Sequence, residues 1–436
     1  MRVRKISNLN QDLVDIIGKI SDIINIKKIK HLVVFGTDEI DCFLGGLHCV
    51  LIKGLREGAK VNIRVLIKWH SNPIDRIHFR SAYQRECVFY RHIVPRLVEL
   101  QQSYEIIEGL KIKFPNCILA DTEDNEEKIV LHFNNDFKLL SRYCKLDFSH
   151  SSIVLKNLAK LHGLSFVLQK TSPNDFEYIR NLCDKDVQYA DPDNIPELLF
   201  DYFKESLEIV DNREIKAKLE EISPHILELL SKSTAPVRNY STICHADCWN
   251  NNLLFKYQVN DINYMLYLSA NKYSHISFPT FKNTGKRPVD VIFVDYQLVR
   301  YASPVTDISY FLYMSTDQEI LCNHYDQLLN IYYGTLSAVL RQCSLEVSDI
   351  YPKEIFQKHL REYSVLGLIE TLISMKIITA DTDEALKMTK MKYYLSEPSG
   401  YSGCNTKNQA FYVERINGVV NEFFNRGYSL DALLCQ

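Results

Sequence analysis

The sequence predicts an α+β fold with two lobes, a β-rich N-terminal lobe followed by a mainly helical C-terminal lobe. Two observations support this prediction. Strand-like segments are concentrated in the first third of the chain, and long helical patterns dominate after about residue 148. The order shows no internal repeat. Segregated strands and helices are typical of α+β folds, and a crevice between two lobes is a natural ligand site.

The strands of the first lobe are predicted from short runs rich in β-branched and aromatic residues. They cover residues 31–36, 47–53, 61–69, 116–120 and 128–133. One helix interrupts them, because apolar residues recur three, four or seven positions apart between Phe79 and Leu97. Pro95 predicts that this helix ends near Val94, since proline cannot donate a helical hydrogen bond.

The second lobe is predicted to be built from long helices. These cover residues 152–169, 195–231, 305–343, 352–378 and 409–426, with short strands near residues 253 and 291. We place the boundary near Asn135, which gives an N-terminal lobe of residues 1–134 and a helical lobe of residues 135–436. Residues 263–286 have no clean period and end in turn residues, which indicates a surface insertion or a mispredicted exon.

The composition favours an enzyme-sized protein with small-molecule or protein partners. The 436 residues are 46% hydrophobic, enough for a large core or two lobes. With 51 basic and 54 acidic residues in no long single-signed block, we expect neither a nucleic-acid partner nor binding to a membrane.

The apolar run of residues 364–378 is interrupted by Glu370 and Lys376 and predicts a buried helix. The start MRVRKISNLNQDLVDIIGKI does not resemble a secretory signal, and twelve cysteines form no CxxC pair, so we expect a cytoplasmic location. The oligomeric state stays open.

The sharpest chemical signal is HADCWNNN at residues 245–252, followed later by Asp295 after the apolar run VIFV. Phosphoryl transfer needs a carboxylate that orients the acceptor hydroxyl and takes its proton, and it needs oxygen ligands for magnesium. Asp247 can supply the first, and Asn252 and Asp295 can supply the second. The alternative is a loop that only caps a turn, but the later asparagine and aspartate argue against it.

Lys68 and Glu86 are candidates for one buried ion pair. Lys68 lies on the polar face of an alternating strand, where a solvent-exposed lysine is the alternative. Glu86 shares a helix face with Ala82 and Ile93, and an unpaired carboxylate there would cost several kcal/mol. The alternative is a carboxylate at the rim of the apolar stripe. A strand lysine held by a helix glutamate can direct its ammonium at the α and β phosphates of a nucleotide.

Four segments resemble the ecdysteroid kinase-like (CHK kinase-like) family, within the aminoglycoside phosphotransferase and choline kinase-like group of the protein kinase-like fold. HADCWNNNLLFKY is similar to its HGDLWxNNxLF loop, and VIFVDYQLVRYASPVTDISYFLY to its VxFVDFQLxRYxSPxxDLxYFL segment. LAKLHGLSF at 158–166 and RECVFYRHIVPRL at 85–97 resemble its LAxxHAxS and ExxFYxxxxPxL helices. These segments extend from about residue 60 to 315.

The resemblance implies a site that uses ATP and Mg²⁺. The implied roles are catalytic base for Asp247, magnesium ligands for Asn252 and Asp295, phosphate lysine for Lys68 with Glu86 as its partner, and loop braces for His245 and Asp307. His245 could instead be a core histidine, and Asp307 could cap a helix. His162 is expected in the core.

The chain also departs from the family pattern. The nucleotide loop is GDNYxS in the family and IDCFLG here, a segment that includes Asp41 and Gly45. In the connection between the lobes, the family's LED motif is replaced by Leu131, His132 and Phe133. Ala246 replaces the glycine of the HGD loop, and Asn252 and Asp295 lie about twice as far apart as in the family.

The leading hypothesis is an ATP- and Mg²⁺-dependent kinase acting on a hydroxyl of a small, lipophilic molecule, of which the resemblance implies an ecdysteroid-like alcohol. A neutral acceptor is favoured because lysines and arginines are interleaved with the carboxylates after Asp307. The alternative is a degenerate kinase fold that binds a ligand or partner without catalysis. A protein kinase is disfavoured, since Gln297 stands where the DFG motif has glycine.

Overall fold

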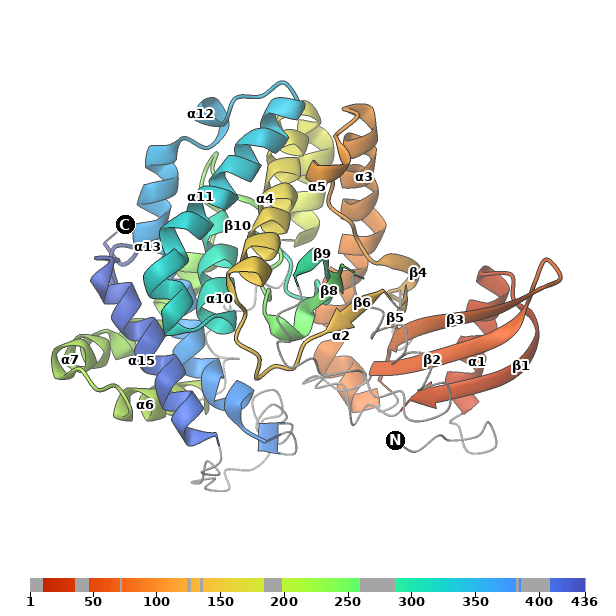
Figure 1. The fold of residues 1–436 in the computed structure, drawn as a ribbon, viewed down its shortest axis with the longest axis horizontal. Helices are drawn as coiled ribbons and strands as arrows, with labels where there is room; N and C mark the ends of the chain where they lie inside the picture. The colour runs from red at the N-terminus through yellow and green to blue at the C-terminus, as the bar shows by residue number, and fades with distance from the viewer. Residues whose placement is uncertain are drawn as a thin grey trace.

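The N-terminal part of the chain forms a five-stranded antiparallel sheet with the order β1-β2-β3-β5-β4 (Figure 1). The strands are β1 (Lys27–Phe35), β2 (Leu47–Arg56), β3 (Ala59–Lys68), β4 (Asn116–Asp121) and β5 (Lys128–His132). The computed structural model describes residues 11–35, 47–70, 73–123, 127–133, 136–183, 198–258, 287–381, 384–385 and 408–435. The five strands predicted from sequence are confirmed, with ends shifted by a few residues.

One face of this sheet is covered by helix α1 (Gln11–Ile23) (Figure 1). Apolar residues of α1 recur on one face of the helix, and they join the inward-facing residues of β2 and β3 in one buried cluster. The cluster includes Leu13, Ile16, Ile17, Ile20, Val50, Ile52, Val65 and Ile67. Alternation along β3 therefore places Val65 and Ile67 in this cluster, and Lys68 on the opposite face.

The helix that carries Glu86 continues beyond Pro95, contrary to the prediction. It runs as α2 (Pro73–Val88), a π-helical turn η3 (Phe89–Ile93) and α3 (Val94–Ser103). Pro95 lies at the start of α3 and directly follows the π turn, in which the Val94 N–H donates to the Phe89 oxygen five residues back. Proline itself has no N–H to donate. The π turn changes the hydrogen-bonding pattern before the proline, and π turns of this kind are often found near functional sites.

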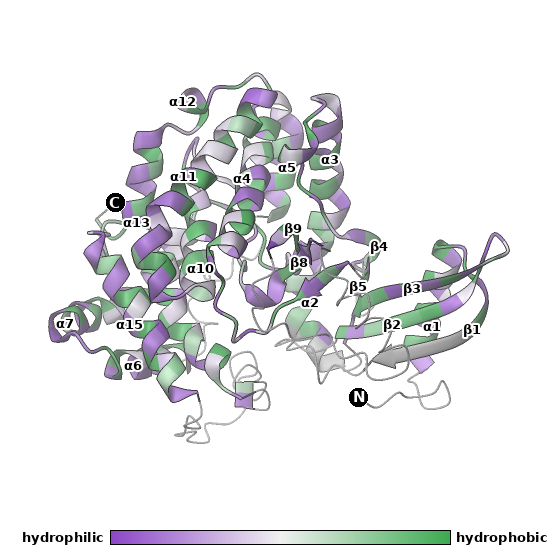
Figure 2. Ribbon diagram, viewed as in Figure 1, coloured by the Kyte–Doolittle hydropathy of each residue, from purple (hydrophilic) through white to green (hydrophobic). Residues whose placement is uncertain are grey.

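The C-terminal part is a helical assembly around α4 (Phe148–Thr171), which lies against α11 (Figure 1). Its other α-helices in the described ranges are α5 (Pro173–Cys183), α6 (Leu198–Glu208), α7 (Arg213–Ile222), α8 (Ile226–Thr234), α10 (Pro304–Ser315), α11 (Gln318–Gln342), α12 (Val347–Ile350), α13 (Lys353–Thr379) and α15 (Gln409–Asn425). The helix predicted at 195–231 is divided into α6, α7 and α8. Hydrophobic and hydrophilic stretches alternate along α11 and α13, as amphipathic helices require (Figure 2).

Two small sheets lie among the described residues of this part. β6 (Phe137–Leu139), β8 (Leu253–Tyr257) and β9 (Pro288–Phe293) form one, and β7 (Thr242–Cys244) pairs with β10 (Arg300–Ala302) in the other. β8 and β9 are an antiparallel pair in which Leu253 is opposite Phe293. The start of β8 and the end of β9 therefore lie side by side.

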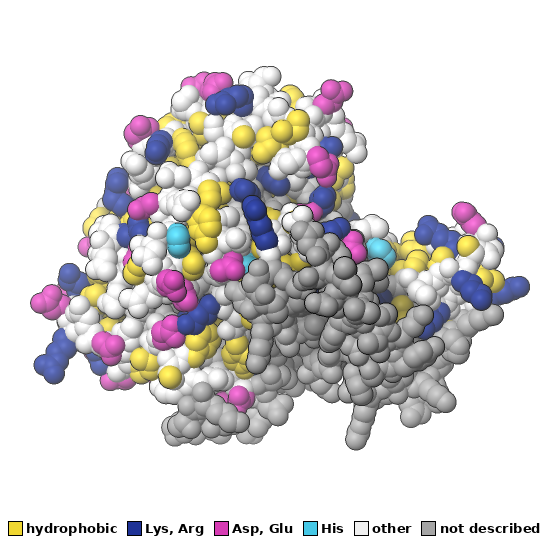
Figure 3. Space-filling model, in the orientation of Figure 1, with side chains coloured by type: hydrophobic (Ala, Val, Ile, Leu, Met, Phe, Trp, Pro, Cys, Tyr) yellow, Lys and Arg dark blue, Asp and Glu magenta, His cyan; other side chains and the backbone are white. Residues whose placement is uncertain are grey.

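The predicted α+β fold with a β-rich N-terminal lobe and a helical C-terminal lobe is confirmed. The predicted boundary at residues 134–135 and the predicted insertion at 263–286 lie outside the described residues. On the described part of the face shown in Figure 3, basic and acidic side chains are interspersed. Among the described helices, none combines the length and the apolar character needed to cross a membrane.

Candidate active site

Asp247 lies in the loop between β7 and the short 3₁₀ turn η7 (Asn250–Asn252), and side chains on both sides fix its carboxylate. The Asn252 amide Nδ2 donates to the Asp247 backbone oxygen at 2.8 Å and to Asp247 Oδ2 at 3.0 Å. The Tyr310 hydroxyl of α10 donates to Asp247 Oδ1 at 2.9 Å. The five-residue step from Asp247 to Asn252 thus brings both side chains together.

Asp307 of α10 holds the backbone just before Asp247. Its Oδ2 accepts the His245 N–H and its Oδ1 accepts the Ala246 N–H, both at 2.7 Å. Ser303, not Asp307, accepts the capping hydrogen bond at the start of α10, from Val305 N–H. The carboxylate of Asp307 therefore contacts the loop and does not cap its own helix.

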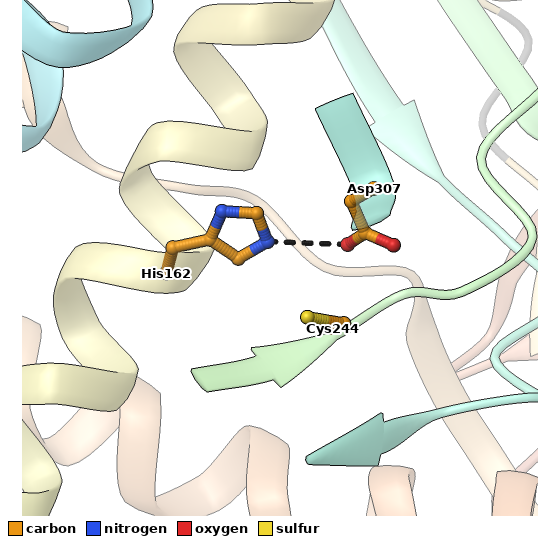
Figure 4. A group of neighbouring side chains, drawn as sticks. All are labelled: His162, Cys244 and Asp307. Atoms are coloured by element: carbon orange, nitrogen blue, oxygen red, sulfur yellow. Dashed lines mark hydrogen bonds and ion pairs between the residues drawn. The ribbon is translucent and has the colours of Figure 1, made fainter. Parts of the chain in front are cut away.

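His162 lies behind this carboxylate and is wholly buried, as expected of a core residue. Its Nε2 is 3.1 Å from Asp307 Oδ2 (Figure 4). Its Nδ1 is 2.8 Å from the Tyr332 hydroxyl. Burial alone would raise the pKa of Asp307, but the hydrogen bond and charge of His162 outweigh it, and the pKa is lowered. Asp307 is thus held in the ionised form that accepts both loop N–H groups.

Cys244 completes a buried group of three possible metal ligands with His162 and Asp307 (Figure 4). Both carboxylate oxygens of Asp307 and both ring nitrogens of His162 already have hydrogen-bond partners. Burial raises the pKa of the Cys244 thiol far above its ordinary value, so the thiolate that a metal requires is disfavoured. These contacts describe a brace for the loop and not a metal site.

His245 connects this loop to the end of β9. Its Nε2 is 3.1 Å from the Val294 backbone oxygen, and the Asp247 N–H points at its Nδ1 from 3.2 Å. A carbonyl only accepts and an N–H only donates, so Nε2 carries the proton and Nδ1 accepts. Burial lowers the pKa of His245, which fits this neutral form.

Lys68 of β3 is buried and meets three oxygen acceptors. Its Nζ is 2.7 Å from Glu86 Oε2, 2.6 Å from Asp295 Oδ1 and 3.1 Å from Gln297 Oε1. Glu86 comes from α2, and Asp295 follows β9. Burial would lower the pKa of Lys68, but the charges of Asp295 and Glu86 outweigh it, so the ammonium form is held.

The two halves of the site meet at the β8–β9 pair. The Val294 N–H donates to the Asn252 backbone oxygen at 3.0 Å, which places Asp295 next to the Asp247 loop. Burial raises the pKa of Asp247 to about 8, with the charge of Asp295 as the next cause and the Tyr310 hydrogen bond opposing both. Asp247 and Asp295 therefore act on each other electrostatically.

The sequence profile of the ecdysteroid kinase-like family matches residues 40–272 and 280–345. The chain belongs to the ecdysteroid kinase-like family. No curated protein matches the sequence significantly.

Similar solved structures include three small-molecule kinases. An ethanolamine kinase from Plasmodium vivax has 11% identity, with 96% of this chain and 89% of that chain covered at a TM-score of 0.39. A choline kinase from Cryptosporidium parvum has 13% identity, with coverages of 97% and 99% and a TM-score of 0.40. A glucosamine kinase has 8% identity, with coverages of 85% and 96% and a TM-score of 0.31. The assignment to the ecdysteroid kinase-like family does not depend on these similarities.

The donor set of this ecdysteroid kinase-like chain suits a hard divalent cation such as Mg²⁺. Asn252 donates through Nδ2, which leaves its Oδ1 without a hydrogen-bond partner among the described residues. Asp295 uses Oδ1 for Lys68, and its Oδ2 likewise has no partner in the described ranges. Amide and carboxylate oxygens are the ligands that Mg²⁺ prefers. Asn252 and Asp295 would hold the ion.

All seven residues predicted for the ecdysteroid kinase-like site lie in this arrangement. Sequence reasoning did not assign Tyr310 or Gln297 to it. Tyr310 follows Asp307 by three residues, so both lie on one face of α10, and this spacing was an available signal.

Two departures from the ecdysteroid kinase-like pattern concern the nucleotide loop and the lobe connection. The altered loop at residues 40–45 lies outside the described residues. In the lobe connection His132 is exposed, whereas Phe133 is buried in a cluster with Phe137 and Leu254, and its N–H donates to the Arg64 oxygen at 2.9 Å.

Proposed function

We propose that this protein is an ATP- and Mg²⁺-dependent phosphotransferase that acts on a hydroxyl of a small molecule. One observation carries the proposal: Asn252 donates to Asp247 at 3.0 Å, Lys68 donates to Asp295 at 2.6 Å, and the backbone hydrogen bond of 3.0 Å from Val294, which precedes Asp295, to Asn252 brings the two pairs together. A carboxylate beside an amide and a second carboxylate, with a lysine next to them, is the set of groups that phosphoryl transfer requires.

We assign the following roles to these groups from their chemistry. The acceptor hydroxyl donates to the Asp247 carboxylate, and its oxygen attacks the γ phosphorus while its proton passes to Asp247. The bond between the γ phosphorus and the bridging oxygen breaks, and ADP leaves with that electron pair. Mg²⁺, when bound, neutralises phosphate charge, and Lys68 directs its ammonium at the phosphates.

The protonation state of Asp247 depends on its neighbours. Burial raises the pKa of the Asp247 carboxyl to about 8, which favours its protonated form in the ligand-free chain, while the hydrogen bonds from Tyr310 and Asn252 favour the ionised form. The negative charge of Asp295 is the second cause of this shift, so a cation held by Asp295 would favour the ionised form that accepts a proton. Binding of a cation at Asp295 is therefore expected to increase the share of Asp247 that is ionised and can act as a base.

The acceptor we propose is a neutral, lipophilic alcohol of the ecdysteroid type. Membership of the ecdysteroid kinase-like family supports this class. One observation favours a cationic acceptor instead: Glu370 of α13 is buried, and its charge contributes to the raised pKa of Asp247. A carboxylate near the acceptor position would stabilise an ammonium, so choline is the second candidate.

The test is release of ADP from Mg²⁺-ATP in the presence of an ecdysteroid, choline or kanamycin, with Asp247→Asn as the control. Turnover with the ecdysteroid above the control supports the proposal, and preference for either cation contradicts the neutral acceptor. Calorimetric titration with nucleotide distinguishes an active kinase from the non-catalytic alternative. Binding of Mg²⁺-ATP without turnover of any of the three acceptors favours the non-catalytic alternative. Absence of nucleotide binding refutes the kinase proposal.

A further inference from the structure

Gln297 lies two residues after Asp295 and is held in place from the helix that carries Glu86. Arg85 Nε donates to the Gln297 backbone oxygen at 3.1 Å. The intervening Tyr296 is wholly buried and stacks on Phe89, with ring centroids 3.5 Å apart and an angle of 11° between the planes. Since Arg85, Glu86 and Phe89 lie along one helical segment, Glu86 and Gln297 are fixed relative to each other.

The ammonium of Lys68 has three N–H donors and no more. Glu86, Asp295 and Gln297 present three oxygens at 2.7, 2.6 and 3.1 Å, so every donor is occupied. A nucleotide phosphate can receive a hydrogen bond from Lys68 only if one of these acceptors leaves.

Burial and chemistry single out Asp295 as the acceptor that leaves. Its side chain is 24% exposed, whereas that of Glu86 is 1% exposed, and Gln297 as a whole is 6% exposed. Asp295 is also the residue proposed to hold Mg²⁺. If its carboxylate binds the cation, one N–H of the Lys68 ammonium is released. Glu86 and Gln297 would then remain as the permanent partners of the ammonium.

A neutral acceptor is the type of group this position requires. With Asp295 engaged elsewhere, the charge of Lys68 is balanced by Glu86 alone. A second permanent carboxylate would leave a net negative charge beside the phosphates, which costs binding energy in a buried site. An amide oxygen supplies the second hydrogen bond without that charge, and a glycine, as in the DFG motif, would supply none.

We propose that Gln297 is a positioning residue, which together with Glu86 holds the Lys68 ammonium toward the nucleotide phosphates while Asp295 exchanges its contact for the metal. This role rests on the proposed function and goes beyond it, because it assigns to Gln297 the recognition of phosphate through Lys68. Gln297 itself does not touch the nucleotide.

The test compares Gln297→Met, which keeps the length and removes the amide oxygen, with Gln169→Met. Gln169 is a half-buried glutamine that donates to the Tyr301 hydroxyl and is not part of the site. Dissociation constants for adenosine, ADP and ATP are measured by calorimetry with Mg²⁺. For Gln297→Met we expect those of ADP and ATP to rise about tenfold, the loss expected for one hydrogen bond to a charged group, and that of adenosine to stay unchanged.

Three outcomes of this titration would contradict the positioning role of Gln297. Equal affinities in Gln297→Met and the wild type, or an equal loss for adenosine and ATP, would overturn the positioning role. A similar phosphate-dependent loss in Gln169→Met would do the same. Gln297→Ala is the second variant if Gln297→Met does not fold, and the same pattern is expected from it.

A second measurement keeps failure of the inference apart from failure of the proposed function. If the wild type binds neither ADP nor ATP, the kinase proposal fails. The Gln297 contact is still tested by the rate at which an amine-reactive reagent labels Lys68, followed by peptide mass spectrometry. Faster labelling in Gln297→Met than in the wild type and Gln169→Met is expected, and an unchanged rate would overturn the contact.

Discussion

Ala246 adopts a backbone conformation that favours glycine, and replacing it with glycine tests how the loop before Asp247 is held. Its φ is +67°, in the left-handed region, and its side chain is buried. Its N–H donates to Asp307 Oδ1 at 2.7 Å, and its carbonyl oxygen accepts from Arg300 Nη2 at 3.4 Å. Both peptide groups are therefore bound in this conformation.

The expected effect of Ala246→Gly on the free energy of unfolding is the sum of three contributions. Relief of the left-handed strain stabilises by about 1–2 kcal/mol. The greater freedom of glycine in the unfolded chain costs about 0.4–1 kcal/mol, and loss of the buried methyl costs about 0.8 kcal/mol. The contributions nearly cancel, so we expect a change smaller than about 1 kcal/mol.

Ala302 provides the matched control. It is wholly buried on β10, and its φ is not positive. Ala302→Gly incurs the same two costs without relief of strain, so we expect a loss of about 1–2 kcal/mol. Urea-induced unfolding measures both variants. Equal losses in the two would refute the strain at Ala246, and a clear fall in turnover for Ala246→Gly would contradict the view that glycine fits this loop.

Three substitutions test single carboxylates. Asp247→Asn is expected to lower turnover by about 10²- to 10⁴-fold with little change in ATP affinity; an equal loss of nucleotide binding would contradict a role as base. Asp295→Asn is expected to weaken binding of ATP with Mg²⁺ more than binding without it, because a charged ligand is lost; unchanged magnesium dependence in calorimetry would argue against that role. Asp307→Asn replaces one acceptor oxygen by an NH₂ group and leaves one buried loop N–H without a partner, so urea unfolding should show a loss of about 1–3 kcal/mol. A variant as stable as the wild type would show that the contact does not brace the loop.

The fold was predictable where a pattern extends over many residues. The alternation along β3 and the long apolar pattern of α4, which is buried on nearly all sides, both follow from burial, which the sequence records directly. Three-residue strands such as β6, β7 and β10 are too short to carry a pattern. The π turn before Pro95 was missed because proline was taken to end the helix, whereas one altered turn allows it to continue.

The site was predictable where residue type and chemistry agree. Asp247, Asn252 and Asp295 were found from their motif, and a carboxylate at Glu86 on an apolar helix face requires a cation such as Lys68. The contact of Tyr310 with Asp247 and that of Gln297 with Lys68 depend on how α10 and the end of β9 are oriented. Tyr310 and Gln297 could equally be core residues, so the sequence does not indicate a role in the site until the orientation of α10 and of the end of β9 is known.

The longer separation between Asn252 and Asp295 does not separate these residues in space. Asn252 directly precedes β8, and Asp295 comes two residues after the end of β9. The register pairs Leu253 with Phe293 at this end and Tyr257 with Pro288 at the other. The additional residues enter between Gln258 and Arg287, beyond the far end of the pair, so the chain can be lengthened there without moving either residue of the site.

Replacing residues 259–286 by a four-residue turn tests this conclusion. The magnesium-dependent affinity for ATP should stay unchanged, because the β8–β9 register is kept. The replacement halves the length of the connection about three times, which should raise the free energy of unfolding by about 2 kcal/mol if only the entropy of loop closure changes. A variant with a glycine-serine segment of the original length is the control, since it keeps the length and removes the side chains. If both variants lose stability, side chains of the replaced segment contribute to folding. If the short variant alone loses affinity for ATP, the connection positions Asn252 and Asp295, and the conclusion that the strand register positions them is wrong.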